Sequence, residues 1–272
     1  MWQRLTALRF CLIGAGRTGS LVAMTLIRQG VQYLTLIDPD VVEQPNLDAM
    51  DAVTERDLGQ SKVAALAEHL GHDLPHARIT ALPQSIMTIE ARELAKSADV
   101  LVCCVDDDVA RLVSGALACC YTKPLLDIGT GVFHHQHATP QVYFSDQTTP
   151  QSLRPRRVLG ADVRLILPHD GCLLCWGGVA DPQAAFQRWR SSQPRRPWHA
   201  ERAGSLRSLN AIAAHLGVRL LEDLIAGQLT RSVWCRFEMD EHGLPSLQHL
   251  PLRRRSSCPL CARQGIGDLL GR

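Results

Sequence analysis

The sequence predicts an α/β protein with a doubly wound, mostly parallel sheet that continues into antiparallel strands. Three observations carry the prediction. Short apolar runs alternate with helical patterns through the first half of the chain, as in parallel sheets covered by helices on both faces. A glycine motif, GAGRTG, joins the first apolar run to the first helical pattern. Beyond Val132 the sequence becomes polar, proline-bearing and poorly periodic. We therefore expect a Rossmann-like nucleotide-binding half over residues 1–132 and an antiparallel half over residues 133–272, continuous as one domain.

The first predicted unit is a strand, a tight turn and a helix, followed by a second strand. RFCLIG (9–14) forms the first strand, and the helix covers about residues 18–29. Gly30 ends the helix, because glycine readily adopts the left-handed conformation found just past helix ends. VQYLTLIDPD (31–40) holds the second strand, which ends at Asp38. This order is one βαβ unit.

Further alternations follow an acidic segment. Ala and Leu recur at helical spacing in SKVAALAEHLGHDL, which predicts a helix over 61–74. The run DVLVCCVDD (99–107) is apolar until its end, as buried parallel strands are. The other elements of this half are expected at 77–86 (strand), 89–98 (helix), 109–123 (helix) and 124–132 (strand).

The second half is predicted to mix strands, one long helix and irregular chain. The longest amphipathic pattern of the sequence lies here, and Gly227 falls near its end. The expected order is two antiparallel strands (141–145 and 162–168), an irregular stretch (181–204), the long helix (205–229), a strand (231–240) and a turn (241–245).

The composition restricts the class of protein. A chain of 272 residues can bury a sizeable core. Its net charge of +2 gives no reason to expect a nucleic-acid partner. Without a signal peptide or an apolar run of roughly 20 residues, we expect a cytoplasmic protein that does not cross a membrane. Ten cysteines in such a chain favour reduced thiols and metal binding over disulfides.

The glycine motif predicts a nucleotide site. Gly14, Gly16 and Gly19 follow a strand and open a helix, where backbone N–H groups can approach phosphates. The alternative is a packing turn without a ligand. Asp38, nineteen residues beyond Gly19, is placed to accept hydrogen bonds from ribose hydroxyls. These features fit NAD as well as ATP.

Two further constellations point to metals. The pairs Cys172/Cys175 and Cys258/Cys261 supply four thiolates for a structural zinc, which would tie the tail to the middle of the chain across an 82-residue gap. Asp106, Asp107 and Asp108 end the buried strand at 99–107 and suit Mg²⁺ beside phosphates. The alternative for these aspartates is a favourable interaction with a helix N-terminus.

In the order and spacing of its motifs, the chain resembles the ThiF/MoeB/ubiquitin-activating enzyme superfamily over nearly its whole length. The motifs are RLTALRFCLIGAGRTGS, LTLIDPDVVEQPNL, DLGQSK, VLVCCVDDDVAR, DGCLLC, SLRSLNAIAAHL and the final CPLC. The resemblance implies adenylation: a carboxylate, usually the C-terminal glycine of a ubiquitin-fold protein, attacks the α-phosphate of ATP to give an acyl-adenylate and pyrophosphate.

The resemblance also implies roles for individual residues. Asp38 would hold the ribose, Asn46 and Lys62 the phosphates, and Asp106 the Mg²⁺, with Asp107 or Asp108 in support. Gly14, Gly16 and Gly19 would lie under the nucleotide. Lys62 and the metal would neutralise charge on the pentavalent phosphorus, and no general base is needed because the attacking carboxylate is already ionised.

Three departures from the family pattern matter. NLDAM has Ala49 where relatives have an arginine, and our hypothesis is that Arg17 in the glycine motif supplies this charge. Many relatives lend an arginine from an N-terminal helix to a partner subunit, and Arg4 is the sole candidate before the first strand. No cysteine lies between Trp176 and Trp234, where thioester-forming relatives carry one.

The last departure indicates that the chain stops at the adenylate or passes the acyl group to another protein. Cys235 is the nearest alternative acceptor, whereas Cys11 and the doublets Cys103/Cys104 and Cys119/Cys120 are expected to be buried. The expected partners are a ubiquitin-like protein or peptide ending in glycine, a conjugating enzyme carrying an acceptor cysteine, and a second subunit in a homodimer or heterodimer. The stretch from Gly129 to Cys175 most resembles bacterial ThiF-type proteins associated with ubiquitin-like modifiers and conjugating enzymes, and this resemblance implies a protein-modification or defence system.

Two other interpretations stay open from the sequence. One is a non-catalytic subunit that keeps the fold and pairs with an active partner or docks a modifier. The other is an NAD- or FAD-dependent oxidoreductase, against which Lys62 and the cysteine pairs argue.

Overall fold

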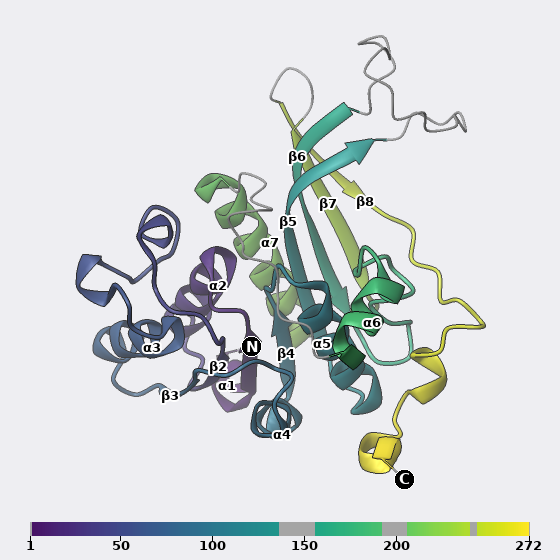
Figure 1. Cartoon of the computed structure of the whole chain (residues 1–272), viewed down its shortest axis with the longest axis horizontal. Helices are drawn as coiled ribbons and strands as arrows, with labels where there is room; N and C mark the ends of the chain where they lie inside the picture. The colour runs from purple at the N-terminus through teal and green to yellow at the C-terminus, as the bar shows by residue number, and fades with distance from the viewer. Residues whose placement is uncertain (1, 136–155, 192–205, 240–243, 272) are drawn as a thin grey trace.

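The computed structural model describes residues 2–135, 156–191, 206–239 and 244–271 (Figure 1). One eight-stranded sheet runs through the molecule in the order β3-β2-β1-β4-β5-β6-β7-β8. The pairs from β3 to β5 are parallel, and those from β5 to β8 are antiparallel. The predicted mixed sheet is confirmed, and the expected half boundary at Val132 falls inside β5.

The elements have the following bounds. The strands are β1 (Arg9–Ile13), β2 (Tyr33–Ile37), β3 (Arg78–Leu82), β4 (Val100–Cys103), β5 (Leu125–His135), β6 (Arg156–Ile166), β7 (Val233–Met239) and β8 (Pro245–His249). The α-helices are α1 (Trp2–Ala7), α2 (Arg17–Arg28), α3 (Lys62–Asp73), α4 (Ile89–Ser97), α5 (Asp108–Cys120), α6 (Pro182–Ser191) and α7 (Arg207–Ala226). Short 3₁₀ turns cover Gln44–Asn46, Glu55–Asp57, Cys261–Arg263 and Gly267–Gly271.

Helices cover both faces of the sheet, which confirms the doubly wound prediction. On one face, side chains such as Leu12 pack with α2, α3 and α7 in a single apolar core. On the other face, the alternate residues Cys11 and Ile13 pack with α4 and α5. β1 therefore buries both of its faces, as its continuous apolar run predicts. No helix in the described part of the chain is long and apolar enough to span a membrane.

Most predicted helices and strands are confirmed, and the main differences lie in the second half of the chain. The stretch expected to be irregular holds α6, which buries Ala185 against the α5 side of the molecule. β8, not expected, pairs with β7 at the sheet edge and leaves most of its side chains exposed. β5 and β6 pair over eleven residues each, so both extend beyond the expected bounds. The strand expected at 141–145 lies outside the described residues.

The carboxyl ends of the parallel strands form the edge that matters for function. β1 and β4 are neighbours although they are not consecutive, so the chain order reverses between them. Ligands of open α/β sheets bind in the crevice at this switch point. β4 ends opposite Asp127, whereas β5 continues to His135. The antiparallel pair of β5 and β6 therefore extends beyond the carboxyl edge of the parallel strands (Figure 1).

Candidate functional site

The glycine turn lies directly over this switch point. Gly14 has a left-handed φ of +93°, and a Cβ there would lie 2.9 Å from the backbone of Cys104 in the turn after β4. A Cβ on Gly19 would lie 1.9 Å from the carbonyl oxygen of Gly14, so close packing explains both glycines. Gly16 has no such neighbour, and a Cβ would meet nothing within 4 Å. The open space at Gly16, before the first turn of α2, is suited to an approaching phosphate.

Asp38 and Lys62 come together beside the glycine turn. The Asp38 carboxylate accepts hydrogen bonds from the backbone N–H of Ala15 (2.7 Å) and of Asp40 (2.8 Å). Burial raises the pKa of Asp38, although the charge of Lys62 opposes the shift. Lys62 Nζ lies 2.9 Å from Asp40 Oδ2 at the start of α3. Each Asp38 oxygen keeps a further acceptor position, so the carboxylate can still bind a hydroxyl.

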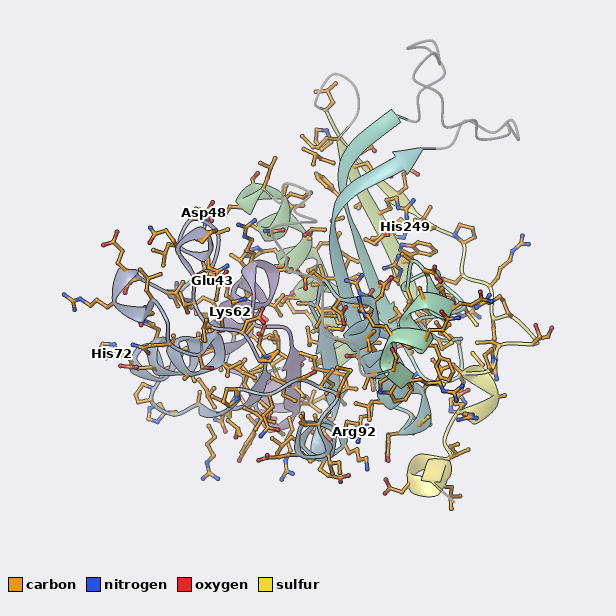
Figure 2. All side chains as sticks on the ribbon, in the orientation of Figure 1. Glu43, Asp48, Lys62, His72, Arg92 and His249 are labelled. Carbon is orange, nitrogen blue, oxygen red and sulfur yellow. The ribbon has the colours of Figure 1, made fainter. Side chains whose placement is uncertain are left out.

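The loop between β2 and α3 carries the next predicted residues. The Asn46 side-chain oxygen accepts the Glu43 N–H at 2.9 Å and so shapes the 3₁₀ turn. Arg17 reaches this turn from α2, donating to Pro45 O at 2.9 Å. Ala49, at the position of the family arginine, is buried. Figure 2 shows Lys62 beneath the loop that bears Glu43 and Asp48.

The three aspartates after β4 are not equivalent. Asp106 is the most exposed of them. Asp107 caps α5, accepting the Ala110 N–H at 3.0 Å through Oδ2, and its Oδ1 pairs with Arg188 of α6. Asp108 accepts the Asp181 N–H at 3.3 Å. Because its carboxylate is the most exposed of the three, Asp106 is the candidate for a metal at this edge.

A row of buried charges, which the sequence reasoning missed, lies next to this turn. Asp127 in β5 is fully buried and lies 3.1 Å from Arg111 Nε and 3.0 Å from Arg164 Nη1. Arg164 also reaches Asp162 at 2.8 Å. Burial opposes the charged form of Arg111, but attraction by Asp127, Cys103 and Asp108 together outweighs it and raises the pKa of the guanidinium. The sequence signal was an aspartate inside the apolar run PLLDIG.

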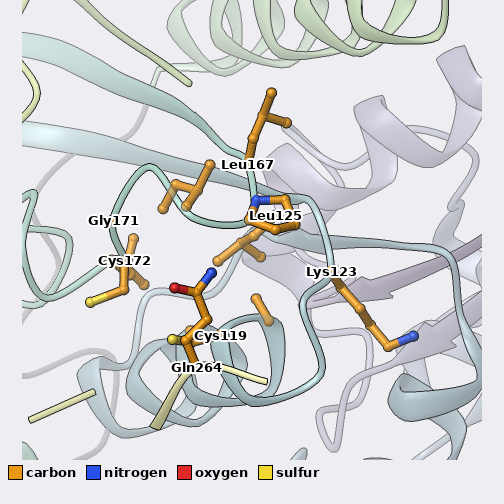
Figure 3. Close-up of a pocket in the computed structure, with 12 residues that line it drawn as sticks. Cys119, Lys123, Leu125, Leu167, Gly171, Cys172 and Gln264 are labelled. Atoms are coloured by element: carbon orange, nitrogen blue, oxygen red, sulfur yellow. The ribbon is translucent and has the colours of Figure 1, made fainter. Parts of the chain in front are cut away.

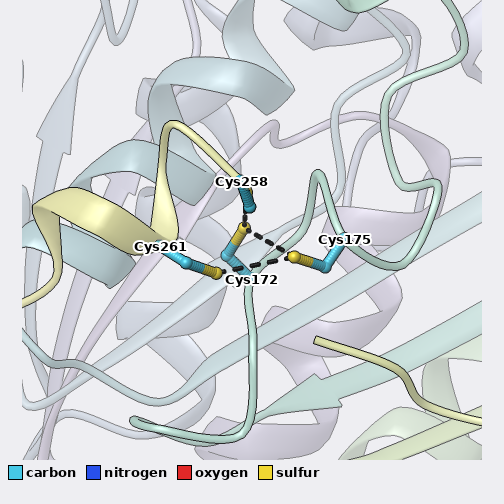
Figure 4. Close-up of side chains that lie close together, drawn as sticks. All are labelled: Cys172, Cys175, Cys258 and Cys261. Atoms are coloured by element: carbon cyan, nitrogen blue, oxygen red, sulfur yellow. Dashed lines mark hydrogen bonds between the residues drawn. The ribbon is translucent and has the colours of Figure 1, made fainter. Parts of the chain in front are cut away.

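The four predicted metal-ligand cysteines converge in the structure (Figure 4). Their sulfur atoms all lie within 4.8 Å of one another. Cys172 Sγ is 3.8 Å from Cys175 Sγ and 3.5 Å from Cys258 Sγ, and Cys175 and Cys261 are also 3.5 Å apart. Tetrahedral zinc with bonds of about 2.3 Å needs sulfurs about 3.8 Å apart, so the cluster is compatible with that ion.

The remaining six cysteines are poor nucleophiles. Cys11, Cys103, Cys119, Cys120 and Cys235 are buried, and Cys104 is partly buried. Burial raises the pKa of each of these six thiols. The expected burial of Cys11 and of the two doublets is confirmed, with Cys104 partly buried. Cys235, the alternative acyl acceptor, is also buried, and its Sγ lies 3.9 Å from His249 Nδ1.

A small hollow lies elsewhere in the molecule (Figure 3). It is lined by Lys123, Leu125, Leu167, Cys172 and Gln264, among others. Leu125 begins β5, so the hollow lies at the amino edge of the sheet, opposite the glycine turn. Arg4 is exposed on α1, which precedes the amino end of β1, and so also lies toward that edge of this chain.

The arrangement at the carboxyl edge suits a phosphate-bearing nucleotide. It combines open backbone at Gly16, the Asp38 carboxylate, the Lys62 and Arg17 cations, and the exposed Asp106. Cations and helix N-termini bind phosphates, and a carboxylate can hold Mg²⁺ against them.

Comparison with protein families gives a match over most of the chain. The ThiF family matches residues 2–228. Among curated proteins, adenylyltransferase and sulfurtransferase uba4 of Aspergillus clavatus is 30% identical over 123 residues, which is 45% of this chain and 25% of the relative. ATP-dependent ubiquitin transferase-like protein Cap2 of Enterobacter hormaechei is 38% identical over 101 residues, 36% of this chain and 16% of the relative. The matched regions thus span a quarter or less of these relatives.

Solved structures match the fold more fully. MccB of E. coli in complex with ATP has a TM-score of 0.66 and 16% identity, covering 96% of this chain and 69% of that chain. MccB with the MccA-N7isoASN peptide has a TM-score of 0.67 and 17% identity, with the same coverage. At such low identity the likeness concerns the fold.

Proposed function

The chain belongs to the ThiF family, and on that premise we propose that it is an ATP-dependent adenylyltransferase. Its substrate would be the C-terminal carboxylate of a ubiquitin-like protein or peptide. The single observation that carries the proposal is the convergence of Gly16, Asp38, Lys62 and Asp106 at the carboxyl edge of the parallel strands. Relatives named as adenylyltransferases, and an ATP complex of the MccB fold, support it.

ATP would bind across the switch point. The ribose hydroxyls would hydrogen-bond Asp38, and the phosphates would extend over Gly16 toward Lys62, Asn46 and Arg17. The Asp40 carboxylate now paired with Lys62 is about half exposed, so the ammonium can exchange that partner for phosphate oxygen. These residues favour ATP over NAD, because the cations Lys62 and Arg17 and the carboxylate Asp106 would all face a polyphosphate.

The reaction needs charge neutralisation more than proton transfer. A substrate carboxylate oxygen would attack the α-phosphorus, the bond from that phosphorus to the bridging oxygen would break, and pyrophosphate would leave with the bond electrons. Lys62 and Arg17 would offset the charge that builds on the phosphate oxygens. Asp106 would hold Mg²⁺, which supplies further charge neutralisation when bound. Its exposed carboxylate fits that ion, which keeps several waters in such sites.

The four-cysteine cluster would hold a structural zinc. All four ligand positions are filled by protein thiols, which leaves no position for a substrate. The backbone N–H of Arg255 lies 3.4 Å from Cys175 Sγ, and this and other hydrogen bonds outweigh burial to lower the pKa of Cys175 to about 7. Burial raises the pKa of Cys172 and of Cys261 in the same cluster, so a metal would displace protons from these thiols on binding.

The acyl group would leave this chain without forming a thioester on it. All ten cysteines are either in the cluster or shielded with raised pKa values. We therefore propose that the adenylate is consumed by a nucleophile on another protein, such as a conjugating enzyme. A dimeric assembly, with a partner supplying an arginine, remains part of this proposal.

One observation favours a second candidate. Ala49 is buried at the family arginine position, so this chain lacks one expected phosphate contact. A non-catalytic subunit that binds nucleotide or a modifier without adenylating it would tolerate that loss.

Exchange of labelled pyrophosphate into ATP tests the proposal. The assay would use wild-type protein, Mg²⁺ and a panel of ubiquitin-like proteins and peptides with free C-terminal carboxylates. We expect substrate-dependent exchange that Asp106→Ala abolishes. Asp99→Ala is the matched control, because Asp99 immediately precedes the amino end of the same strand, where its carboxylate accepts the Arg9 N–H. Loss of exchange in both variants, or none in wild type, contradicts the proposal.

A further inference from the structure

The turn that carries Asp106 is short and held at each end. β4 ends at Cys103 and α5 begins at Asp108, which leaves four residues between them. The Cys104 N–H donates to Ile13 O at 2.8 Å, and Asp107 caps α5. Between these anchors the turn has a third, the Val105 carbonyl, which accepts a hydrogen bond from Arg111 Nη2 at 2.7 Å.

Arg111 connects this turn to β5. It lies in the first turn of α5, and its side chain is 14% exposed. Nε lies 3.1 Å from Asp127 Oδ1, and Nη2 also reaches Ile128 O at 3.4 Å. The planar guanidinium therefore contacts the turn and the neighbouring strand at once, which a lysine ammonium on a flexible stem does not reproduce.

The Arg111 guanidinium packs against Gly129 and Asp127 of β5. A Cβ on Gly129 would lie 3.2 Å from Arg111 Nη2, so a glycine in β5 admits the side chain. Asp127 is fixed from the other side by Arg164 at 3.0 Å, and Arg164 stacks over the Trp234 ring at 4.5 Å. Arg111 thus rests against a strand whose acidic partner cannot move freely.

A gain in protein stability does not by itself explain why the Arg111–Asp127 ion pair is buried. Two charges taken out of water lose hydration that their attraction barely repays, and apolar residues of similar volume often serve as well. A buried ion pair that ends on the backbone of a functional turn supplies orientation instead. Hydrogen bonds from surrounding groups orient metal ligands, and the Arg111 bond to Val105 O holds the residue that precedes Asp106.

We propose that Arg111 is a positioning residue that, through Asp127, holds the Val105 carbonyl and thereby sets Asp106 in place to ligate Mg²⁺. This inference rests on the proposed nucleotide site and deepens it. Arg111 touches neither substrate nor metal in this account. It acts on Asp106 through one backbone hydrogen bond.

The test compares Arg111→Lys with Arg164→Lys. Both variants keep a positive charge beside Asp127, but only Arg111 contacts the turn. We expect Arg111→Lys to raise the Kd for ATP measured with Mg²⁺ roughly tenfold, as loss of outer-shell partners does. The Kd measured without Mg²⁺ should not change, and Arg164→Lys should leave both values near wild type. Calorimetry on the full chain needs no acyl substrate.

A second readout is independent of the metal. Hydrogen exchange of the backbone amides at 105–107, in protein without nucleotide, should be faster in Arg111→Lys than in Arg164→Lys. Equal Mg²⁺ dependence of the two variants, or equal amide exchange, overturns the positioning role. If wild type binds ATP equally with and without Mg²⁺, the proposed metal site fails, which is a different result from an unaffected variant.

Discussion

Ala49 stands where the resemblance to the family implies an arginine. The side chain is buried with 2% of its surface exposed, in the loop that follows β2. Arg17, from the glycine turn, places its guanidinium against the same loop, 2.9 Å from Pro45 O and 3.6 Å from an Asp48 oxygen. The Asp48 side chain is 73% exposed, so this ion pair contributes little to stability.

Replacing Arg17 tests whether it supplies the missing charge. Arg17→Ala should lower pyrophosphate exchange by roughly two orders of magnitude, as loss of other preorganised donors does. Arg28→Ala is the control, because Arg28 is an exposed arginine in the last turn of the same helix. An Arg17→Ala protein that exchanges like wild type would show that the charge comes from elsewhere.

At the residue scale, local spacing predicted what the strand ends supply. Gly14, Asp38 and Asp106 each follow a parallel strand, and parallel strands deliver their ends to one edge. Arg111 and Arg188 escaped prediction for a different reason. Their partners, Asp127 and Asp107, are 16 and 81 positions away, and neither spacing has a local signature.

The cysteine cluster joins two segments of the chain that lie outside the sheet. Cys172 and Cys175 follow β6, whereas Cys258 and Cys261 lie in the tail after β8. Lys96 provides another tie, since it lies 2.6 Å from Asp268 in the tail. The Lys96–Asp268 ion pair is exposed and contributes little to stability, so the metal would be the main connection between the tail and the rest of the molecule.

Metal removal should therefore release the tail and spare the nucleotide site. The purified protein should contain one zinc per chain, and chelation or Cys258→Ser should speed tryptic cleavage at the exposed Arg253, Arg254 and Arg255. ATP affinity should be unchanged, because the carboxyl edge is built from other residues. Cys120→Ala, a buried cysteine outside the cluster, serves as control. Metal-free wild type that resists trypsin equally would contradict the structural zinc.

Among the elements, α6 carried a signal that the sequence interpretation passed over. Pro182 occupies the first helical position, and Asp181 before it accepts the Ala184 N–H at 2.9 Å. An aspartate followed by proline is a common helix start. β8 had no comparable signal, because an edge strand with most side chains exposed lacks the alternation that marks a half-buried one.

Over the whole molecule, one sheet serves both halves. Its parallel part brings the predicted nucleotide residues to the edge, and its antiparallel part rises beside them (Figure 1). The order of motifs along the chain predicted this arrangement. The row of charges on β5, β6 and β7 was not predictable, because Asp127 pairs with Arg164, and Asp162 with Arg236, across strands whose register only the fold establishes.

The most direct measurement of the central claim is the intact mass of a candidate substrate after incubation with the protein, ATP, Mg²⁺ and inorganic pyrophosphatase. The account predicts a substrate that carries one AMP on its C-terminal carboxylate, with no adduct when Asp106→Ala replaces wild type. It also predicts no acyl group on any cysteine of this chain. Wild-type protein that binds ATP with Mg²⁺, yet forms no AMP adduct with any ubiquitin-like protein or peptide of the panel, would contradict the account and identify a non-catalytic member of the family.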